Sequence, residues 1–397
     1  MAPAGLAGGV GKEGEGVRIL MVCPSYPPQE VTCGVGDYTR CLVEELNRQG
    51  EEIVVLCSSQ YRGAAQGPVR VLPIFPRWTL DQALHLHFSG AVPRGEILHL
   101  QYTPDLYGRD AGFKLVPLLA RLRRRGPRTV VTFHTLTGGS TWSRVWAVLL
   151  LASAHHSISA NEEVTSMVRR RFPTLYARLS EIPIGANIPV TSPNGTAREA
   201  GRRRLGVPVG IPLLVHFGLV YPGKGLETLF AALPDLLRFH PGTRLVIVGD
   251  TRPESQGYQE TLGALAVRLG VARAIIWAGR RSGEGVSEIL QAADLFVVPY
   301  DDGVSIRRGS LMAGLAHGLP VVSTRCALPS AYLTEGENIA LVPPRDPQAL
   351  SARISSLLAA PDEAARLARG ARMLAGRFAW PVIAGETRAL YARVLER

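Results

Sequence analysis

The sequence predicts an α/β fold made of two Rossmann-like, parallel-sheet domains that face a central cleft. The chain has 397 residues, which is too long for one ordinary core and suits two domains of similar size. Short apolar runs rich in β-branched residues alternate with segments of helical spacing through both halves. Uninterrupted apolar strands separated by helices are typical of a parallel sheet that is covered on both faces.

The expected elements follow this alternation from residue 18 onward. In the first half we expect strands at 18–23, 52–57, 97–100, 129–133 and 156–159, and helices at 37–49, 115–125, 146–154 and 162–172. In the second half we expect strands at 212–217, 244–248, 274–277, 295–299 and 320–323, and helices at 226–238, 258–269, 286–292, 310–316, 350–358 and 364–372. The polar stretch 191–212 is the expected linker, and ligands of such folds bind at the carboxyl ends of the strands.

Composition excludes several classes of protein. With 46% hydrophobic and 19% charged residues, the chain is globular rather than disordered. Five cysteines without a C-x-x-C pair match neither a disulfide scaffold nor a zinc site, and they favour a reducing compartment. The first 17 residues lack an apolar signal core, and the longest apolar run, 146–154, is far shorter than the roughly 18–20 residues that span a bilayer. We therefore expect a cytoplasmic protein.

The charge of the chain favours anionic partners. The formal charge is +11, yet only three of the 44 basic residues are lysines: Lys12, Lys114 and Lys224. Compositional bias of the genome is one explanation, and binding of diphosphates or anionic lipids is the other. The arginine clusters within 121–125 and 169–171 lack the interleaved aromatics of nucleic-acid sites, so we expect no nucleic-acid partner. Solvated helix faces explain them, and peripheral contact with the inner membrane face is the alternative for 121–125.

Two motifs in the second half predict an anion site. In Phe217-Gly-Leu-Val-Tyr-Pro-Gly-Lys-Gly225 a strand ends in a glycine-rich turn, and Lys224 lies where a helix begins. From Gly218 to Lys224 the turn offers free backbone N–H groups beside a cation, as a diphosphate requires. In the block 299–323 a polar loop runs into a helix whose start carries Arg307, Arg308, Gly309 and Ser310, a second anion-binding arrangement. A surface lysine and a solvated loop are the bland alternatives.

Two further features lie after strands of the first half. Gly34 and Gly36 form a G-x-G before the first helix, where backbone can approach a phosphate or sugar, although a plain loop–helix junction explains them equally well. His134 directly follows the strand 129–133, and a histidine there can hydrogen-bond a substrate hydroxyl or carbonyl. His99 and Gln101 also lie at a strand end. No metal ligand set, nucleophile elbow or Walker A loop is present in the sequence, so we expect no metal and no cofactor.

Together these motifs resemble the family 4 retaining glycosyltransferases of the GT-B fold, over nearly the whole chain after residue 17. The resemblance rests on Gly34–Gly36, Thr132-Phe-His134, the stretch 182–187, the loop Gly218–Gly225, the block 289–323 and the closing segments 378–380 and 389–391. It implies a flexible tail at 1–17, an acceptor-side domain at 18–195, a donor-nucleotide domain at 205–376, and a last helix at 377–397 that crosses back to the first domain.

The chain departs from the family pattern at three positions. The phosphate-binding arginine of the family corresponds to Leu219, and its two glutamates correspond to Ser305 and Ala313. We expect Arg307 and Arg308 to replace the missing arginine. Asp301 or Asp302 is then expected to supply a carboxylate.

The resemblance implies transfer of a hexose-type sugar from a nucleotide diphosphate sugar to an unidentified acceptor, with retention and without metal. Catalytic roles are expected for His134, Lys224 and Arg308, and substrate binding for Gly34, Gly36, Gly218, Lys224, Ser305, Arg307, Arg308, Gly309 and Ser310. Two alternatives stay open: a non-transferase GT-B enzyme such as a sugar-nucleotide epimerase, and a non-catalytic nucleotide-sugar-binding protein.

Overall fold

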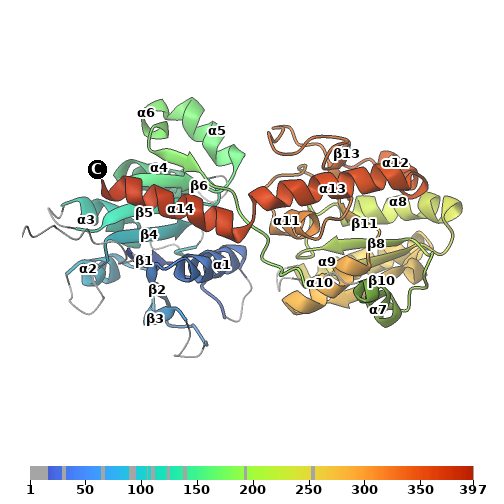
Figure 1. Ribbon diagram of the computed structural model, residues 1–397, viewed down its shortest axis with the longest axis horizontal. Coiled ribbons are helices and arrows are strands. Elements are labelled where there is room, and N and C mark those ends of the chain that lie inside the picture. Colours follow the sequence, from blue (N-terminus) through green and yellow to red (C-terminus); the bar gives the residue numbers. More distant parts are fainter. Residues whose placement is uncertain are drawn as a thin grey trace, which may run out of the picture. The chain divides into compact units, whose positions relative to one another are not determined.

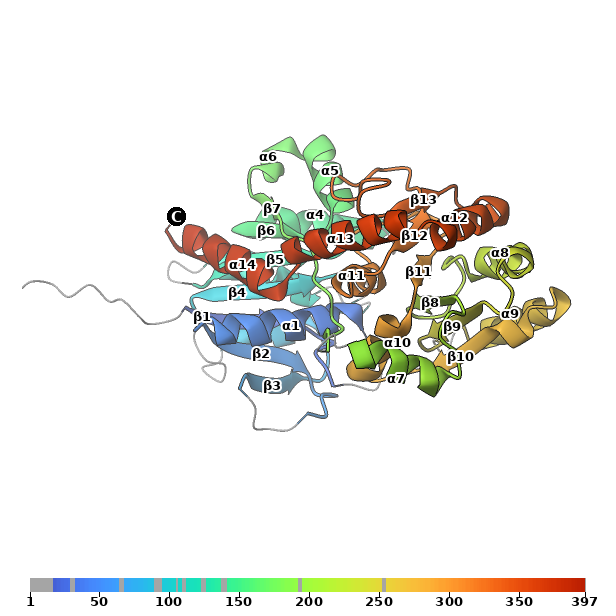
Figure 2. The same cartoon turned by 45° about the vertical axis from the view of Figure 1, so that its right-hand side comes forward.

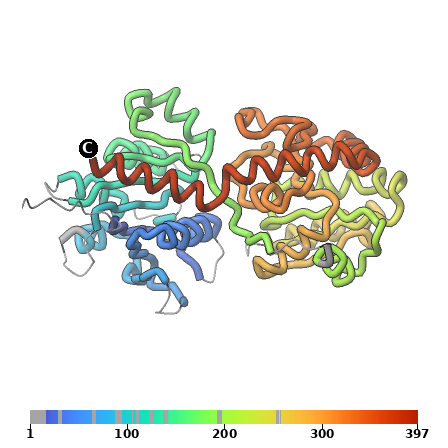
Figure 3. The backbone as a smooth tube through the Cα atoms, in the orientation of Figure 1, coloured from blue at the N-terminus to red at the C-terminus, as the bar shows by residue number. Residues whose placement is uncertain are grey.

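The computed structural model describes residues 17–28, 33–63, 68–88, 95–104, 106–108, 112–122, 126–136, 141–191, 195–251 and 255–396. The chain forms two compact units: one contains the residues up to Ile158 and from Arg388 onward, and the other is Ser159–Thr387. Figure 3 shows the trace leaving the first unit and returning to it in the last helix. The expected tail up to residue 16 and the arginines at 123–125 lie outside the described residues.

The first sheet has seven strands in the order β3-β2-β1-β4-β5-β6-β7 (Figure 1). Its strands are β1 Arg18–Val22, β2 Glu52–Ser58, β3 Arg70–Phe75, β4 Ile97–Tyr102, β5 Arg128–Phe133, β6 His156–Ser159 and β7 Leu179–Glu181. The helices between them are α1 Gly34–Arg48, α2 Leu80–Phe88, η1 Gly112–Leu115, α3 Val116–Leu122, α4 Thr141–Ser153, α5 Glu162–Arg171 and α6 Pro173–Tyr176. The pairings of β1 with β2 and β4, of β2 with β3, and of β4 with β5 are parallel, as predicted.

The second sheet has six strands in the order β10-β9-β8-β11-β12-β13, paired in parallel. They are β8 Leu213–Phe217, β9 Arg244–Val248, β10 Ile275–Gly279, β11 Leu295–Val298, β12 Val321–Thr324 and β13 Ala340–Val342. The helices are α7 Gly195–Leu205, α8 Leu226–Phe239, α9 Gln256–Arg268, η3 Ala272–Ala274, α10 Gly283–Ala292, α11 Gly309–Ala316, α12 Pro347–Ala359, α13 Pro361–Arg377 and α14 Trp380–Leu395.

Helices cover both faces of the second sheet (Figure 2). Successive side chains of a strand point to opposite faces. Leu213 and Val215 of β8 accordingly join one core cluster with residues of α10, α11 and α13. Leu214 joins the other cluster, with residues of α8, α9 and α12. Both clusters are almost fully buried, which explains why the strands are uninterrupted apolar runs in the sequence.

The strand order places the predicted motifs at the switch point of each sheet. In the first sheet, β2 and β3 lie on one side of β1, and the later strands begin with β4 on its other side. In the second sheet, β9 and β10 lie on one side of β8, and the later strands begin with β11 on its other side. Ligands of open α/β sheets bind outside the carboxyl ends of the strands at such a point. The loop 218–225 follows β8 and the loop 299–308 follows β11, so the two predicted anion-binding loops lie side by side in the second unit.

Several predicted boundaries were wrong. Helix α1 begins at Gly34 rather than at residue 37, so the G-x-G lies in its first turn and not in a loop. The expected linker 191–212 contains α7, an arginine-rich helix stabilised by tertiary contacts: the buried Arg202 donates to Asp294 at 2.6 Å and to the carbonyl of Ile211. Further elements were not predicted: β7 and β13 have three residues each, β3 is half-exposed and contains a proline, α2 has a weak pattern, and α6, η1 and η3 are single turns.

Candidate functional site

The loop after β8 is a tight glycine-rich turn. Its backbone N–H groups are not all free as predicted, because those of Gly218 and Val220 donate to the carbonyls of Val248 and Asp250. The backbone φ angles of Gly218, Gly223 and Gly225 are +143°, +96° and +72°, a region that residues with a Cβ rarely adopt. Gly225 is the N-cap residue of α8, and a Cβ placed on it would lie 1.8 Å from the carbonyl oxygen of Pro299. The glycines therefore let this loop fold tightly against the loop after β11 at the start of a helix.

The structure brings Lys224 and Arg308 together on one aromatic ring. The Lys224 ammonium lies 5.3 Å from the centre of the Tyr300 ring, and the Arg308 guanidinium carbon lies 3.9 Å from it. Lys224 is only 7% exposed, and it also lies 4.9 Å from the centre of the Tyr221 ring. Aromatic faces hold cations in place by electrostatic attraction. Tyr300 lies inside the block 299–323 but was not among the predicted site residues.

Gly218 and Ser310 complete this cluster. A Cβ placed on Gly218 would lie 3.5 Å from the Ser310 hydroxyl and 3.8 Å from the Lys224 ammonium nitrogen. The Ser310 hydroxyl is hydrogen-bonded to the Tyr300 hydroxyl at 2.7 Å, in the first turn of α11. Four of the predicted residues, Gly218, Lys224, Arg308 and Ser310, thus gather around Tyr300.

Carboxylates hold the two arginines unequally. Asp302 accepts hydrogen bonds from both guanidiniums, and Arg307 also forms an ion pair with Glu163 at 3.2 Å. The Arg308 side chain is 12% exposed, and its Nε has no hydrogen-bond partner among the described residues. Arg308 thus has a buried donor without a partner among the described residues, and it lies on the same Tyr300 ring as Lys224.

The remaining residues of this loop have structural roles. The Ser305 hydroxyl accepts from the backbone N–H of Arg307, and its carbonyl accepts from the N–H of Arg308. Gly309 is the first residue of α11. Ala313 is fully buried in the core cluster of the second unit, so this position contributes no polar group. Asp301 pairs with Arg345 at 3.5 Å, which leaves Asp302 as the carboxylate in contact with the arginines.

In the first unit, the start of α1 packs tightly against the loop after β1. A Cβ placed on Gly36 would lie 2.0 Å from the carbonyl oxygen of Ser25, whereas one placed on Gly34 would meet nothing within 4 Å. Only Gly36 is therefore required by packing. Gly34 is exposed, and the N-cap residue Cys33 makes no side-chain cap bond.

The two glycines give a matched pair of substitutions. We expect Gly36→Ala to lower the free energy of unfolding by about 1–3 kcal/mol, because the new methyl group must displace backbone. Gly34→Ala should be neutral or stabilising by up to about 1 kcal/mol, because alanine is the better helix former. Urea unfolding of both variants measures the difference. Equal stability of the two would contradict the packing described for Gly36.

His134 is held among groups of the first unit. Its Nε2 lies 2.8 Å from the side-chain oxygen of Gln101, and the Tyr38 ring meets it edge-on with the centres 4.8 Å apart. Burial lowers the pKa of His134 to about 3. The imidazole is therefore neutral at physiological pH, and its polar contacts are those of one N–H donor and one acceptor nitrogen.

Two fully buried histidines should make stability depend on pH. Burial lowers the pKa of His99 to about 3 and that of His216 to about 4, from 6.5 in each case. The unfolded chain binds more protons than the folded one below pH 6.5, so stability should fall as the pH drops from about 6.5 towards 4. Each histidine contributes up to about 1.4 kcal/mol per pH unit.

Urea unfolding between pH 7 and pH 4.5 checks this expectation. His216→Gln should flatten the dependence, because it removes a buried group whose pKa is lowered on folding. An identical slope for wild type and His216→Gln would show that His216 is not held neutral by burial.

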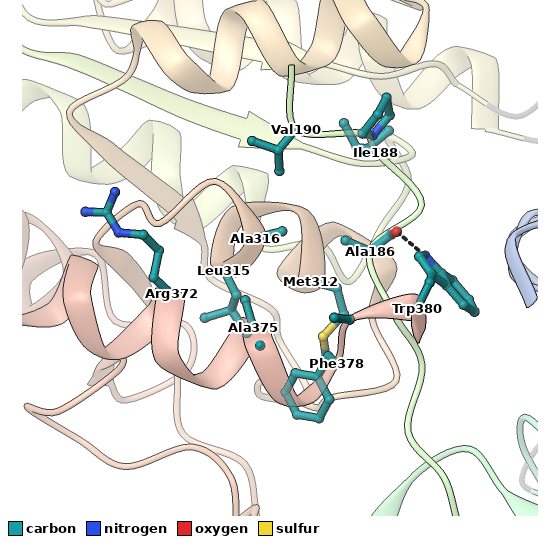
Figure 4. A pocket seen from close by; sticks show the side chains of 13 residues that line it. Ala186, Ile188, Val190, Met312, Leu315, Ala316, Arg372, Ala375, Phe378 and Trp380 are labelled. Atoms are coloured by element: carbon teal, nitrogen blue, oxygen red, sulfur yellow. Dashed lines mark hydrogen bonds between the residues drawn. The ribbon is translucent and has the colours of Figure 1, made fainter. Parts of the chain in front are cut away.

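A separate cavity of about 390 Å³ lies in the second unit between the segment 186–190 and helices α11 and α13 (Figure 4). Its walls are mainly apolar, with Ile188, Met312 and Phe378 among them, and Arg372 is its charged residue. The Trp380 indole N–H beside it donates to the carbonyl of Ala186 at 2.6 Å. None of the predicted anion-binding residues lines this cavity.

The described residues contain neither a cluster of metal ligands nor a helix that could cross a membrane. No group of three His, Cys, Asp or Glu side chains gathers there as metal ligands would. Within the same ranges, every helix is too short or too polar to cross a bilayer.

Two family models match the chain. "Glycosyl transferase 4-like domain" matches residues 33–182, and "Glycosyl transferases group 1" matches residues 211–360. The first match contains Gly34, Gly36 and His134, and the second contains the cluster around Tyr300. Together the two matches span both sheets.

Similar curated proteins have related names. The chain is 33% identical to a D-inositol 3-phosphate glycosyltransferase of Acidothermus cellulolyticus, over 51% of this chain and 45% of that protein. It is 27% identical to the phosphatidyl-myo-inositol mannosyltransferase of Mycobacterium leprae, over 95% of this chain and 97% of that protein. Matches to the first curated relatives span about half of their length, from 45% to 55%.

Solved structures share the fold at low identity. Sucrose-phosphate synthase from Thermosynechococcus elongatus superposes with a TM-score of 0.75 at 20% identity, over 96% of this chain and 99% of that chain. The Anabaena protein HepE in complex with UDP and glucose superposes with a TM-score of 0.74 at 17% identity, over 95% and 100%.

Proposed function

We propose that this chain, which belongs to the group 1 glycosyltransferases, transfers a sugar from a nucleotide diphosphate sugar to an acceptor hydroxyl. Its first half matches a glycosyltransferase 4-like domain, and the chain has the GT-B fold. One observation carries the proposal: Lys224 and Arg308 lie on the same Tyr300 ring, at the carboxyl ends of β8 and β11. Two cations at a helix start match a diphosphate in charge and in position.

The chemical step needs stabilisation of the leaving diphosphate. When the bond between the sugar and the phosphate breaks, negative charge grows on the diphosphate oxygens. Lys224 and Arg308 would stabilise that charge, and such preorganised electrostatic contacts are the largest contribution in many enzymes. Arg307 would add to the field of the site, although Glu163 and Asp302 already neutralise much of its charge.

The first unit would supply contacts to the sugar and the acceptor. His134 is neutral, so it would orient a donor-sugar or acceptor hydroxyl by hydrogen bonding. Gly34 is exposed and would let backbone at the start of α1 approach a phosphate or sugar, whereas Gly36 is buried against Ser25. The resemblance to retaining enzymes supports transfer with retention, which proton NMR of the product's anomeric position would check.

The names of the relatives support an inositol-bearing acceptor. The relatives include a D-inositol 3-phosphate glycosyltransferase and a phosphatidyl-myo-inositol mannosyltransferase. The relative in Mycolicibacterium smegmatis, 29% identical over 97% of its length, is named as GDP-mannose-dependent. Arg169, Arg170 and Arg171 are exposed at the end of α5 and would suit peripheral contact with an anionic membrane carrying such an acceptor.

Transfer of labelled sugar tests the proposal. The full chain would be incubated with radiolabelled GDP-mannose or UDP-glucose and with either inositol 3-phosphate or vesicles containing phosphatidylinositol. We expect label in the acceptor fraction for at least one combination, and vesicles without phosphatidylinositol are the control. Interconversion of the donor alone, without transfer, would instead support an epimerase. Sedimentation of the protein with the same vesicles tests the membrane contact.

We expect removal of divalent metal to leave the rate of transfer unchanged. Lys224 and Arg308 already supply the positive charge that a metal ion would bring to the diphosphate. The measurement is the transfer rate with and without excess EDTA. A loss that added Mg²⁺ or Mn²⁺ restores would contradict the metal-free proposal.

A further inference from the structure

We infer that Gln101 is a positioning residue for His134: its side-chain amide holds the imidazole in one orientation and one tautomer, with the hydrogen on Nε2. This inference rests on the proposed function, in which His134 contacts a reacting hydroxyl. Gln101 lies in β4, the neighbour of the strand that precedes His134, and its side chain is fully buried.

The chemistry of the contact fixes the tautomer. The side-chain oxygen of Gln101 lies 2.8 Å from His134 Nε2. An amide oxygen accepts and cannot donate, so the hydrogen of this bond belongs to the imidazole. A neutral imidazole has one N–H hydrogen, which one of its two ring nitrogens carries. If Nε2 carries it, Nδ1 is the acceptor nitrogen. The tautomer of a histidine is set in this way by the partner of its other nitrogen.

The orientation of the Gln101 amide is fixed on its other side. Its NH₂ group donates to Met21 Sδ at 3.2 Å and lies 3.5 Å from His99 Nε2. Both neighbours can accept a hydrogen. A reversed amide would place its oxygen against the Met21 sulfur. Two acceptor atoms would then face each other in the buried interior with no hydrogen between them. The backbone carbonyl of Gln101 also accepts from the Tyr107 hydroxyl at 2.8 Å.

The last helix extends this network. His99 Nδ1 lies 2.6 Å from the Tyr391 hydroxyl of α14, and His99 Nε2 lies 2.7 Å from the Thr132 hydroxyl. All of these residues belong to the first unit. A chain of buried contacts thus runs from Tyr391 through His99 and Gln101 to His134. Buried, satisfied networks of this kind hold their members in one arrangement.

Nitrogen-15 NMR of protein labelled at histidine tests the tautomer directly, because the two ring nitrogens of a neutral imidazole have distinct shifts when protonated and unprotonated. The chain has nine histidines, and His134→Gln assigns the signal. We expect the Nε2–H form in wild type. Gln101→Met, which keeps the length of the side chain but replaces the amide oxygen by a weakly accepting thioether, should lose the fixed tautomer. An Nδ1–H form in wild type, or an unchanged signal in Gln101→Met, would overturn the inference.

Thr132→Val is the matched control. It removes a hydrogen bond of the same network without touching His134, so the His134 signal should stay unchanged while that of His99 shifts. A His134 signal that moves equally in Thr132→Val and in Gln101→Met would mean general disruption and would overturn the specific role of Gln101. Thermal unfolding confirms that both variants are folded.

The kinetic measurement separates this inference from the proposed function. Where wild type transfers sugar, Gln101→Met should lower kcat roughly tenfold with little change in the KM of the donor, about the value of one hydrogen bond. An unchanged kcat would overturn the positioning role and leave the proposed function standing. If wild type transfers no sugar, the proposed function fails, and the nitrogen-15 spectra still decide whether Gln101 fixes the tautomer.

Discussion

Replacing Lys224 with methionine should lower the rate of sugar transfer by about 10²–10³-fold, the usual effect of removing one preorganised group that stabilises developing charge. Methionine fills similar space between the Tyr221 and Tyr300 rings, so the loop should keep its shape. Affinity for the nucleoside diphosphate should also fall, because the product carries the charge that Lys224 contacts. Steady-state transfer kinetics and a calorimetric titration with the nucleoside diphosphate measure both effects.

Lys114→Met is a suitable control for this experiment. Lys114 is also a buried lysine near an aromatic ring, with its ammonium 5.8 Å from the centre of the Tyr102 ring. It belongs to the first unit and lies outside the Tyr300 cluster. We expect Lys114→Met to bind the nucleoside diphosphate as wild type does. Equal losses in the two variants would indicate a general effect of burying methionine and would contradict the role of Lys224.

Replacing Arg308 with alanine should weaken binding of the nucleotide sugar by about 10–100-fold, because a charge-assisted hydrogen bond contributes about 1.5–3 kcal/mol. The glycosyltransferase family has a phosphate-binding arginine at the position that Leu219 occupies here. No arginine therefore directly follows β8 in this chain. Equilibrium titration of the full chain with the donor measures the change. An unchanged affinity would end the proposal that Arg308 replaces the missing arginine.

Arg307→Ala provides the graded comparison. Arg307 is 30% exposed and pairs with both Glu163 and Asp302, whereas Arg308 is 12% exposed and pairs with Asp302. We therefore expect a smaller loss from Arg307→Ala than from Arg308→Ala. The reverse order would show that the anion approaches from the exposed side of the loop.

Much of the fold was predictable because its strands are uninterrupted apolar runs. All ten expected strands correspond to strands of the two sheets, in agreement with burial on both faces. The elements that were missed depend on tertiary contacts: α7 depends on the Arg202–Asp294 pair, and β13 on pairing with β12. The pattern of one sequence does not show which distant residues will come into contact.

The candidate site was predictable in part. The glycines and cations of 218–225 and 299–310 stand out by residue type, and strand order then placed Gly218, Lys224, Arg308 and Ser310 together. Gln101 was noted at a strand end, but its contact with His134 was not predictable, and neither was the contact of Tyr300 with Lys224 and Arg308, because no spacing pattern encodes such pairs. The position of Asp302 between two arginines likewise depends on a loop conformation that no periodicity encodes.

A thermal-shift screen of nucleotide sugars on wild type and Lys224→Met tests the central claim most directly. A ligand present at about 100 times its dissociation constant adds about 2.7 kcal/mol of stability to the folded state. We expect at least one nucleotide sugar to raise the Tm of wild type by several degrees and to have a much smaller effect on Lys224→Met. Equal shifts for both proteins, or no shift with any nucleotide sugar, would contradict a donor site built on Lys224.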